Sequence, residues 1–238
     1  MPLRDHFRSP VDDKHSWDEL HGLWPAIVLQ HLVKVLPEPY FAAPGVLLGK
    51  LFEIDVATFD NREFSNRGEQ DAGTVAAYAP PKPTLALEPE LPNQDVYEIR
   101  VYDGRRRLVA AIELVSPSNK DRPERRELFV AKVAALLRNR ICVTVVGVVS
   151  ALEANLYADL LELVKGVDPA LDTERSPMYA ATVRTRLDGP RKLMDSWYHP
   201  LAVGAALPVL PIWLSNDLAV RLDLESTDEE TCRTLRIA

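Results

Sequence analysis

The chain has 238 residues, of which 47% are hydrophobic and 26% charged, and its formal net charge is −7 at pH 7. This composition is ordinary for a globular protein and excludes a chain that is disordered over most of its length. The negative balance excludes a general electrostatic attraction to nucleic acid, so any contact with phosphates needs a local basic patch.

Cysteine usage and apolar runs indicate the compartment. Cys142 and Cys232 offer neither a disulfide framework nor a metal-ligand spacing, and Cys142 is expected to be a buried free thiol. The charged N-terminus lacks the apolar segment of a signal peptide, and the longest apolar run, residues 141–152, is too short to span a bilayer. We therefore expect a protein of the reducing bacterial cytoplasm that makes no membrane contact.

The N-terminal part is predicted to form a helix followed by two strands. Ser16 and Glu19 have the spacing of a capping box that opens the helix, and Pro25 is expected to kink or split it. A short strand is expected near residues 46–48, and residues 51–59 alternate as a second strand. Residues 60–95 are rich in proline, which favours an extended excursion or lid.

The middle of the chain contains the clearest pattern, a hairpin with its turn at Asp103-Gly104. The strands of this hairpin are predicted at residues 96–102 and 107–115. Further elements follow in chain order: a helix at 123–139, a strand at 141–149, a helix at 155–164 and strands at 180–185, 209–214 and 219–224. Ser226 and Glu229 have the spacing of another capping box, which predicts a short terminal helix from there.

Glu113 is the most informative residue, because residues 108–115 are apolar on both alternating faces. Such a strand is typically covered on two sides, so the Glu113 carboxylate is predicted to be buried. An isolated buried carboxylate is strongly unfavourable and must be protonated, paired or bound to a metal. The partner could be a metal ion, or it could be Arg100, Arg107 or Lys132 in a structural ion pair.

Two further carboxylates are expected to approach Glu113 from neighbouring strands. Glu98 lies on the partner strand of the hairpin, and Asp55 lies on the strand at 51–59. Converging carboxylates repel one another unless a proton or a cation separates them, and hard oxygen ligands suit Mg²⁺ or Mn²⁺. We therefore predict a Mg²⁺ or Mn²⁺ site at Asp55, Glu98 and Glu113, although an exposed strand face explains Glu98 equally well.

Two lysines are candidates for a catalytic cation beside this site. Lys120 follows the end of the Glu113 strand, and Lys132 lies at the border of the apolar face of the 123–139 helix. Either ammonium could stabilise charge on an attacked phosphate or help to orient a metal-bound water. Lys132 could equally extend into solvent.

A dense basic cluster is the candidate contact surface for DNA or RNA. Its members are Arg105, Arg106, Arg107, Arg122, Arg125 and Arg126. Guanidinium groups at this density could neutralise phosphates, and a solvated charged turn is the alternative explanation.

The order of helix, strand, Asp-bearing strand, Glu-bearing strand, helix and strand resembles the core of the PD-(D/E)XK restriction-endonuclease-like superfamily. The chain is also similar to an uncharacterised bacterial domain family whose members carry E-I-R, a turn and then I-E-L-x-S-P-x-N-K. Here these motifs are Glu98-Ile-Arg100 and Ile112-Glu-Leu-Val-Ser-Pro-Ser-Asn-Lys120. The resemblance covers most of the chain and implies an α-β-β-β-α-β core.

By this resemblance, Asp55 and Glu113 correspond to the acidic residues of the superfamily motif. Two departures are visible: Val115 stands where the motif lysine is usual, and Ile54, not proline, precedes Asp55. Lys120 or Lys132 would then act as a migrated lysine. The implied activity is hydrolysis of phosphodiester bonds by a Mg²⁺-dependent endonuclease.

The expected architecture is therefore α/β, with a mixed sheet flanked by helices in a single domain of residues 1–238. The nuclease-like core would cover about residues 16–165, and a C-terminal extension would cover residues 166–238. A catalytically inactive nuclease-like binding or scaffold domain is the alternative function, and hydrolysis of a small phosphorylated molecule is a third.

Overall fold

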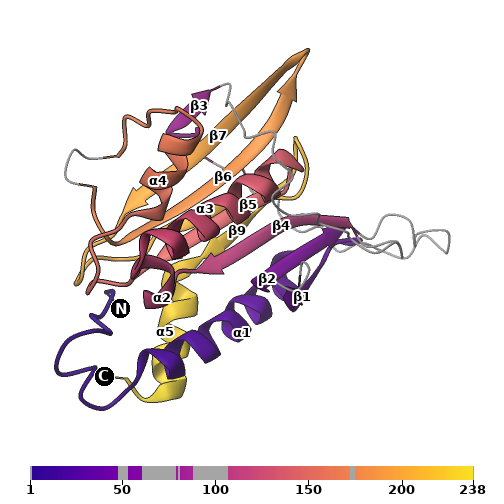
Figure 1. Cartoon of the computed structure of the whole chain (residues 1–238). Coiled ribbons are helices and arrows are strands. Elements are labelled where there is room, and N and C mark those ends of the chain that lie inside the picture. Colours follow the sequence, from indigo (N-terminus) through magenta and orange to yellow (C-terminus); the bar gives the residue numbers. More distant parts are fainter. Residues whose placement is uncertain are drawn as a thin grey trace.

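The computed structural model describes residues 2–47, 53–60, 79, 81–87, 107–171 and 175–237, with backbone alone for 44–47 and 53–60. Its helices and strands follow one another along the chain as shown in Figure 1. They are α1 (Trp17–Val35), β1 (Phe41–Leu47), β2 (Glu53–Asp60), β3 (Leu85–Leu87), β4 (Arg107–Leu114), α2 (Pro117–Lys120), α3 (Pro123–Arg138), β5 (Cys142–Gly147), α4 (Leu156–Leu163), β6 (Tyr179–Asp188), β7 (Arg191–Pro200), β8 (Val209–Trp213), β9 (Ala219–Asp223) and α5 (Leu224–Leu235).

The described strands form a seven-stranded mixed sheet in the order β1-β2-β4-β5-β6-β7-β3, and β8 and β9 form a second, two-stranded sheet. Strands β4 and β5 run parallel, joined through α3, and the other neighbours in the large sheet are antiparallel. Parallel neighbours need such a crossover because the chain must return to the starting end of the first strand, and a tight turn joins only antiparallel strands. The predicted α/β class, with a mixed sheet flanked by helices, is confirmed.

Helices cover both faces of the sheet, which is why β4 is apolar on both sides. Ala111 and Val115 pack into the core cluster that contains α3 and α4. Ile112 and Leu114 face the opposite way, into a second cluster with α1, α5 and the β8–β9 pair. Figure 1 shows α3 and α4 on one side of the sheet and α1 with α5 on the other.

The two predicted helix starts have different outcomes. Ser16 is the N-cap of α1 and accepts a hydrogen bond from the Glu19 backbone N–H at 3.3 Å, as predicted, and α1 continues through Pro25. The terminal helix, in contrast, begins at Leu224, before the predicted Ser226. Its N-cap is Asp223, whose Oδ1 accepts from the Ser226 backbone N–H at 3.0 Å. Asp223 is the last residue of β9, and aspartate is a favourable N-cap, so the helix starts directly after the strand.

Strand β7 is an addition that the sequence patterns did not indicate. It pairs with β6 along its whole length, from Tyr179↔Pro200 to Asp188↔Arg191. The turn between them contains Gly189 at a φ of +59°, a backbone conformation that glycine adopts at little cost. The far edge of β7 pairs with β3, which lies inside the proline-rich stretch expected to be an excursion. The predicted hairpin strand at 96–102 falls outside the described residues.

Within the part of the chain that the structure describes, no helix combines the length and the apolar character needed to cross a bilayer.

Candidate functional site

Glu113 lies near the end of β4, on the face of the sheet that α3 covers, and it is 3% exposed. Its Oε2 accepts a hydrogen bond from the Lys132 Nζ at 2.8 Å, and Lys132 is itself buried. The predicted burial of the carboxylate is therefore confirmed. The partner of this carboxylate is Lys132, one of the three cations that the sequence offered, and the ion pair is shielded from solvent.

Helix α3 holds Lys132 in this position through its apolar face. Val133 and Leu136, its neighbours on α3, are buried in the core cluster between α3 and the sheet. The Lys132 ammonium also lies 5.8 Å from the centroid of the Phe129 ring, within the range of a cation–π interaction. Lys132 thus points back over β4 and does not extend into solvent.

The backbone register places Asp55 beside this pair. Strands β2 and β4 are antiparallel, with Val56 opposite Ile112 and Ala57 opposite Ala111. Continuing this register by one residue puts position 55 opposite position 113. Opposite positions of an antiparallel pair share one face of the sheet and are close neighbours. Glu98, the third predicted ligand, lies outside the described residues.

Lys120 serves a different group of atoms. Its ammonium is 2% exposed and donates hydrogen bonds to the carbonyl oxygens of Val149, Leu152 and Pro177, at 3.0, 3.3 and 2.6 Å. Burial lowers the pKa of Lys120 to about 8, so the side chain is mostly protonated at neutral pH. Three carbonyl acceptors satisfy its three N–H donors, and Lys120 joins the loops that follow β5 and precede β6.

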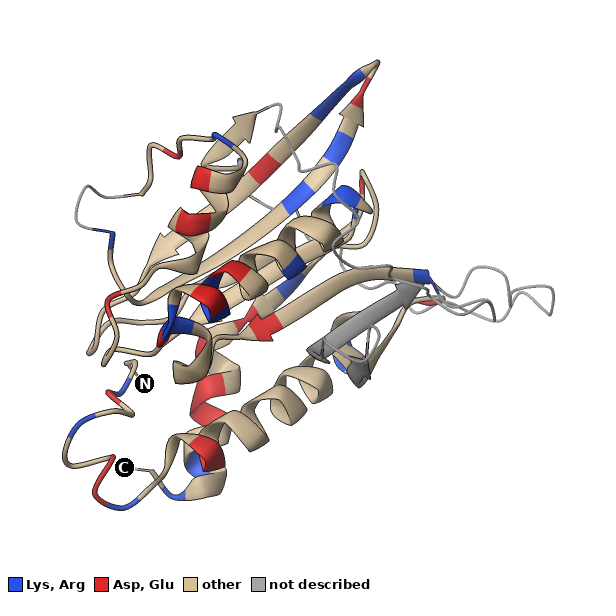
Figure 2. Cartoon of the chain, viewed as in Figure 1, with Lys and Arg blue, Asp and Glu red and all other residues tan. Residues whose placement is uncertain are grey.

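The predicted arginine cluster is divided between two ends of the sheet. Arg107 begins β4, whereas Arg122, Arg125 and Arg126 lie at the start of α3, beyond the end of β4. Arg126 lies 3.9 Å from an Asp159 oxygen, and Glu124 and Glu127 flank Arg125 and Arg126 at the start of α3, where Figure 2 shows red and blue positions together. The described arginines therefore do not form one continuous patch; Arg105 and Arg106 lie outside the described residues.

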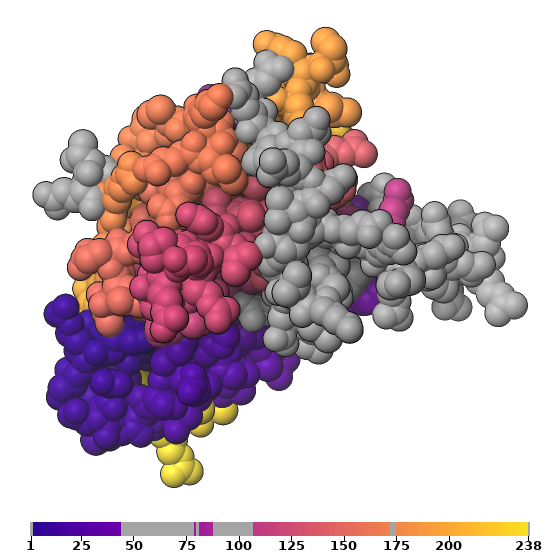
Figure 3. All heavy atoms as spheres, in the orientation of Figure 1, coloured from indigo at the N-terminus to yellow at the C-terminus, as the bar shows by residue number. Residues whose placement is uncertain are grey.

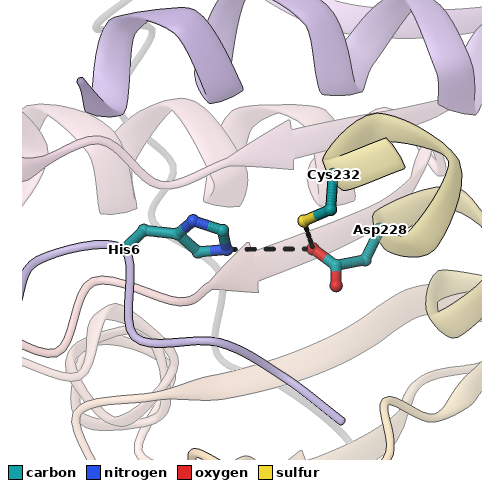
Figure 4. Close-up of side chains that lie close together, drawn as sticks. All are labelled: His6, Asp228 and Cys232. Carbon is teal, nitrogen blue, oxygen red and sulfur yellow. Dashed lines mark hydrogen bonds and ion pairs between the residues drawn. The ribbon is translucent and has the colours of Figure 1, made fainter. Parts of the chain in front are cut away.

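A second polar cluster was missed at the level of sequence. His6, from the N-terminal segment, points toward Asp228 and Cys232 of α5, and all three are buried (Figure 4). The His6 Nε2 lies 3.9 Å from the Asp228 Oδ1, and the Cys232 Sγ lies 3.8 Å from the same oxygen. Asp228 and Cys232 are four residues apart and therefore share a helix face, a spacing visible in the sequence. The approach of His6 to these two residues cannot be recognised in the sequence, because His6 comes from the other end of the chain.

Desolvation controls protonation in this cluster. Burial lowers the pKa of His6 to about 4 and raises the pKa of Asp228 to about 6. Burial likewise raises the pKa of the Cys232 thiol to about 12, against a smaller opposing effect of Arg4. A nucleophilic cysteine needs a lowered pKa, so the raised pKa of this thiol does not favour a role as nucleophile.

Two groups in the described part of the chain offer side chains that could bind a metal ion. One is the Glu113–Lys132 pair beside the Asp55 position, and the other is the His6–Asp228–Cys232 cluster. The first could hold a hard cation through carboxylate oxygens, and the second offers nitrogen, oxygen and sulfur ligands. No protein-family model matches the chain. Comparison with curated proteins and with solved structures likewise finds no match.

Proposed function

We propose that the chain is a metal-dependent nuclease or nuclease-like protein that binds Mg²⁺ or Mn²⁺ at Glu113 and Asp55. The observation that carries this proposal is the buried contact of 2.8 Å between Lys132 of α3 and Glu113 of β4. Strand β4 is the neighbour of β2, which contains Asp55. A carboxylate with a lysine at hydrogen-bond distance and a second acidic position opposite it supplies the elements of a phosphodiester-cleaving site.

The order of the elements supports a restriction-endonuclease-like core. Helix α1 is followed by the antiparallel neighbours β1, β2 and β4, then by α3 and by β5, which is parallel to β4. This is the α-β-β-β-α-β order that the resemblance implies. Strand β3 interrupts it in the sequence but pairs with β7 at the far edge of the sheet.

Lys132 takes the role of the lysine that is missing at Val115. Val115 is fully buried and its backbone N–H donates to the Val146 carbonyl, so this position is part of the core. In the proposed mechanism, Glu113 and Asp55 would hold a Mg²⁺ or Mn²⁺ ion, which would lower the pKa of a bound water and so supply the nucleophile. The Lys132 ammonium then stabilises the charge that develops on the attacked phosphate. Lys120 receives no catalytic role because backbone carbonyls engage its ammonium.

The test is cleavage of single- and double-stranded DNA and of RNA in Mg²⁺ or Mn²⁺, with nucleotides assayed in parallel. Glu113→Gln and Asp55→Asn should abolish cleavage, and Lys132→Met should slow it by about 100-fold or more. Glu124→Gln, at an exposed position of α3, is the matched control and should retain full activity. Undiminished cleavage by folded Glu113→Gln would overturn the site assignment, and activity on nucleotides alone would redirect the substrate class.

A non-catalytic nuclease-like binding domain is the second candidate, favoured by one observation. Lys132 already neutralises Glu113, so the carboxylate does not require a metal for its charge. Titration with Mn²⁺ distinguishes the two. Saturable binding that Glu113→Gln removes supports the enzyme, whereas the absence of binding at millimolar Mn²⁺ supports the inactive domain.

A further inference from the structure

We infer that His6, Asp228 and Cys232 form a binding site for Zn²⁺ that ties the N-terminal segment to α5. The three ligand atoms all lie within 4.8 Å of one another, and the residues belong to opposite ends of the chain. In Figure 4 the imidazole, carboxylate and thiol converge on one point from two elements. This site is distinct from the Glu113 site and does not depend on the proposed nuclease function.

Within the described part of the chain, two buried polar atoms of this cluster lack hydrogen-bond partners, and one of them, the His6 Nε2, faces Asp228 (Figure 4). Among the described residues, neither the His6 Nε2 nor the Asp228 Oδ2 has a hydrogen-bond partner. His6 is 2% exposed and Asp228 is 0% exposed, so bulk solvent does not reach these residues. Buried polar atoms without partners are costly and uncommon, and each one calls for an explanation such as an ion. A bound cation would give the His6 Nε2 a partner.

The distances fit a tetrahedral ion with little movement. Zinc bonds of about 2.0–2.3 Å at tetrahedral angles place neighbouring ligand atoms about 3.3–3.8 Å apart. The observed separations from the Asp228 Oδ1 are 3.9 Å to the His6 Nε2 and 3.8 Å to the Cys232 Sγ. These two separations therefore lie close to the range that a tetrahedral ion requires, and the third pair of ligand atoms is within 4.8 Å.

The donor set selects the metal. Imidazole and thiolate are borderline and soft ligands, which suit Zn²⁺ and not Mg²⁺. The Cys232 thiol proton leaves to solvent as the sulfur–zinc bond forms, and one thiolate with one carboxylate then balances the charge of the ion. Arg4 acts electrostatically on all three residues, and Glu225 opposes it at Asp228, so zinc would have to bind in place of the interaction between Arg4 and Cys232.

The site has a structural consequence because of where its ligands originate. The N-terminal segment is held to the loop before β8 by Leu3, whose N–H donates to the Ala205 carbonyl at 2.8 Å. Helix α5 packs on α1, where the Trp24 Nε1 donates to the Thr227 Oγ1 at 3.0 Å. The N-terminal residues lie beside α5 in Figure 1 and form the lower surface in Figure 3. Zinc would join these two ends of the chain.

The experiment uses the full chain, stripped with a chelator and titrated with Co²⁺ and then with Zn²⁺. Wild type should bind one equivalent of Co²⁺ with a thiolate-to-cobalt charge-transfer band in the near ultraviolet, and Zn²⁺ should displace it. Cys232→Ser should lose that band, and His6→Gln should weaken binding by about tenfold or more. Cys142→Ala, which removes the other buried thiol, is the matched control and should keep the band.

Thermal unfolding supplies a readout that does not depend on the variants. Zn²⁺ should raise the midpoint of wild type, because a ligand that binds only the folded chain stabilises it. Absence of a thiolate band and of a midpoint shift in wild type would overturn the proposal, whatever the folding of the variants. Glu113→Gln should still bind one Zn²⁺, which separates failure of this site from failure of the nuclease proposal.

Discussion

Single residues determine the charge balance at the candidate active site, and the Glu113–Lys132 pair is the clearest case. Removing only the cation leaves a carboxylate in a buried position, so we expect Lys132→Met to destabilise the protein by about 3–5 kcal/mol. Urea unfolding measures this loss. The double variant Glu113→Gln/Lys132→Met should recover part of it, because no charge then remains buried. Equal losses in the single and double variants would contradict the coupling.

Lys120 is a second single residue with a predicted effect, a dependence of the free energy of unfolding on pH. Its pKa is about 8 in the folded chain and about 10.4 in an unfolded one, so the unfolded chain binds more protons between these values. The contribution of Lys120 to stability therefore rises with pH across this window, by about 2 kcal/mol between pH 7.5 and 9.5. Comparing urea unfolding of wild type and Lys120→Met at both pH values isolates the group. A difference that stays constant would contradict the prediction.

At the scale of elements, the start of α5 illustrates how a strand passes directly into a helix. Asp223 ends β9 and caps α5, so Asp223→Ala should cost about 1 kcal/mol in thermal or urea unfolding. Asp223→Asn keeps an acceptor and should lie close to wild type. Ser226→Ala removes only the hydroxyl group of a residue inside the helix and should change stability by less than about 0.5 kcal/mol. The reverse ranking of Asp223→Ala and Ser226→Ala would restore the original prediction of the helix start.

At the scale of the whole molecule, the C-terminal third completes the core that the first two thirds begin. Strand β6 pairs with β5 from Val143↔Val183 to Gly147↔Tyr179, and residues of β6 and β7 lie in the same core cluster as α3. We therefore expect a fragment of residues 1–165 to lack a cooperative unfolding transition, because it exposes an open strand edge and loses buried residues from both core clusters. Circular dichroism during thermal unfolding tests this, with the full chain as control.

Local patterns in the sequence predicted what depends on neighbouring residues. The apolar spacing of α3, the β-branched run of β5 and the two-sided apolar pattern of β4 each arise within one element, so periodicity reveals them. The burial of Glu113 followed from the same pattern. Strand β7 was not predicted because its buried positions include the polar residues Asp195 and Ser196, which obscure the alternation of apolar and polar side chains.

Only the tertiary structure decided which distant residues meet. The sequence offered Lys120 and Lys132 equally, but the return of α3 over β4 brings Lys132 to Glu113, while Lys120 meets carbonyl oxygens from two loops. The approach of His6 to Asp228 spans nearly the whole chain and has no local signature. Hydrophobic periodicity records whether a side chain is buried, whereas its partner depends on packing between elements far apart in sequence.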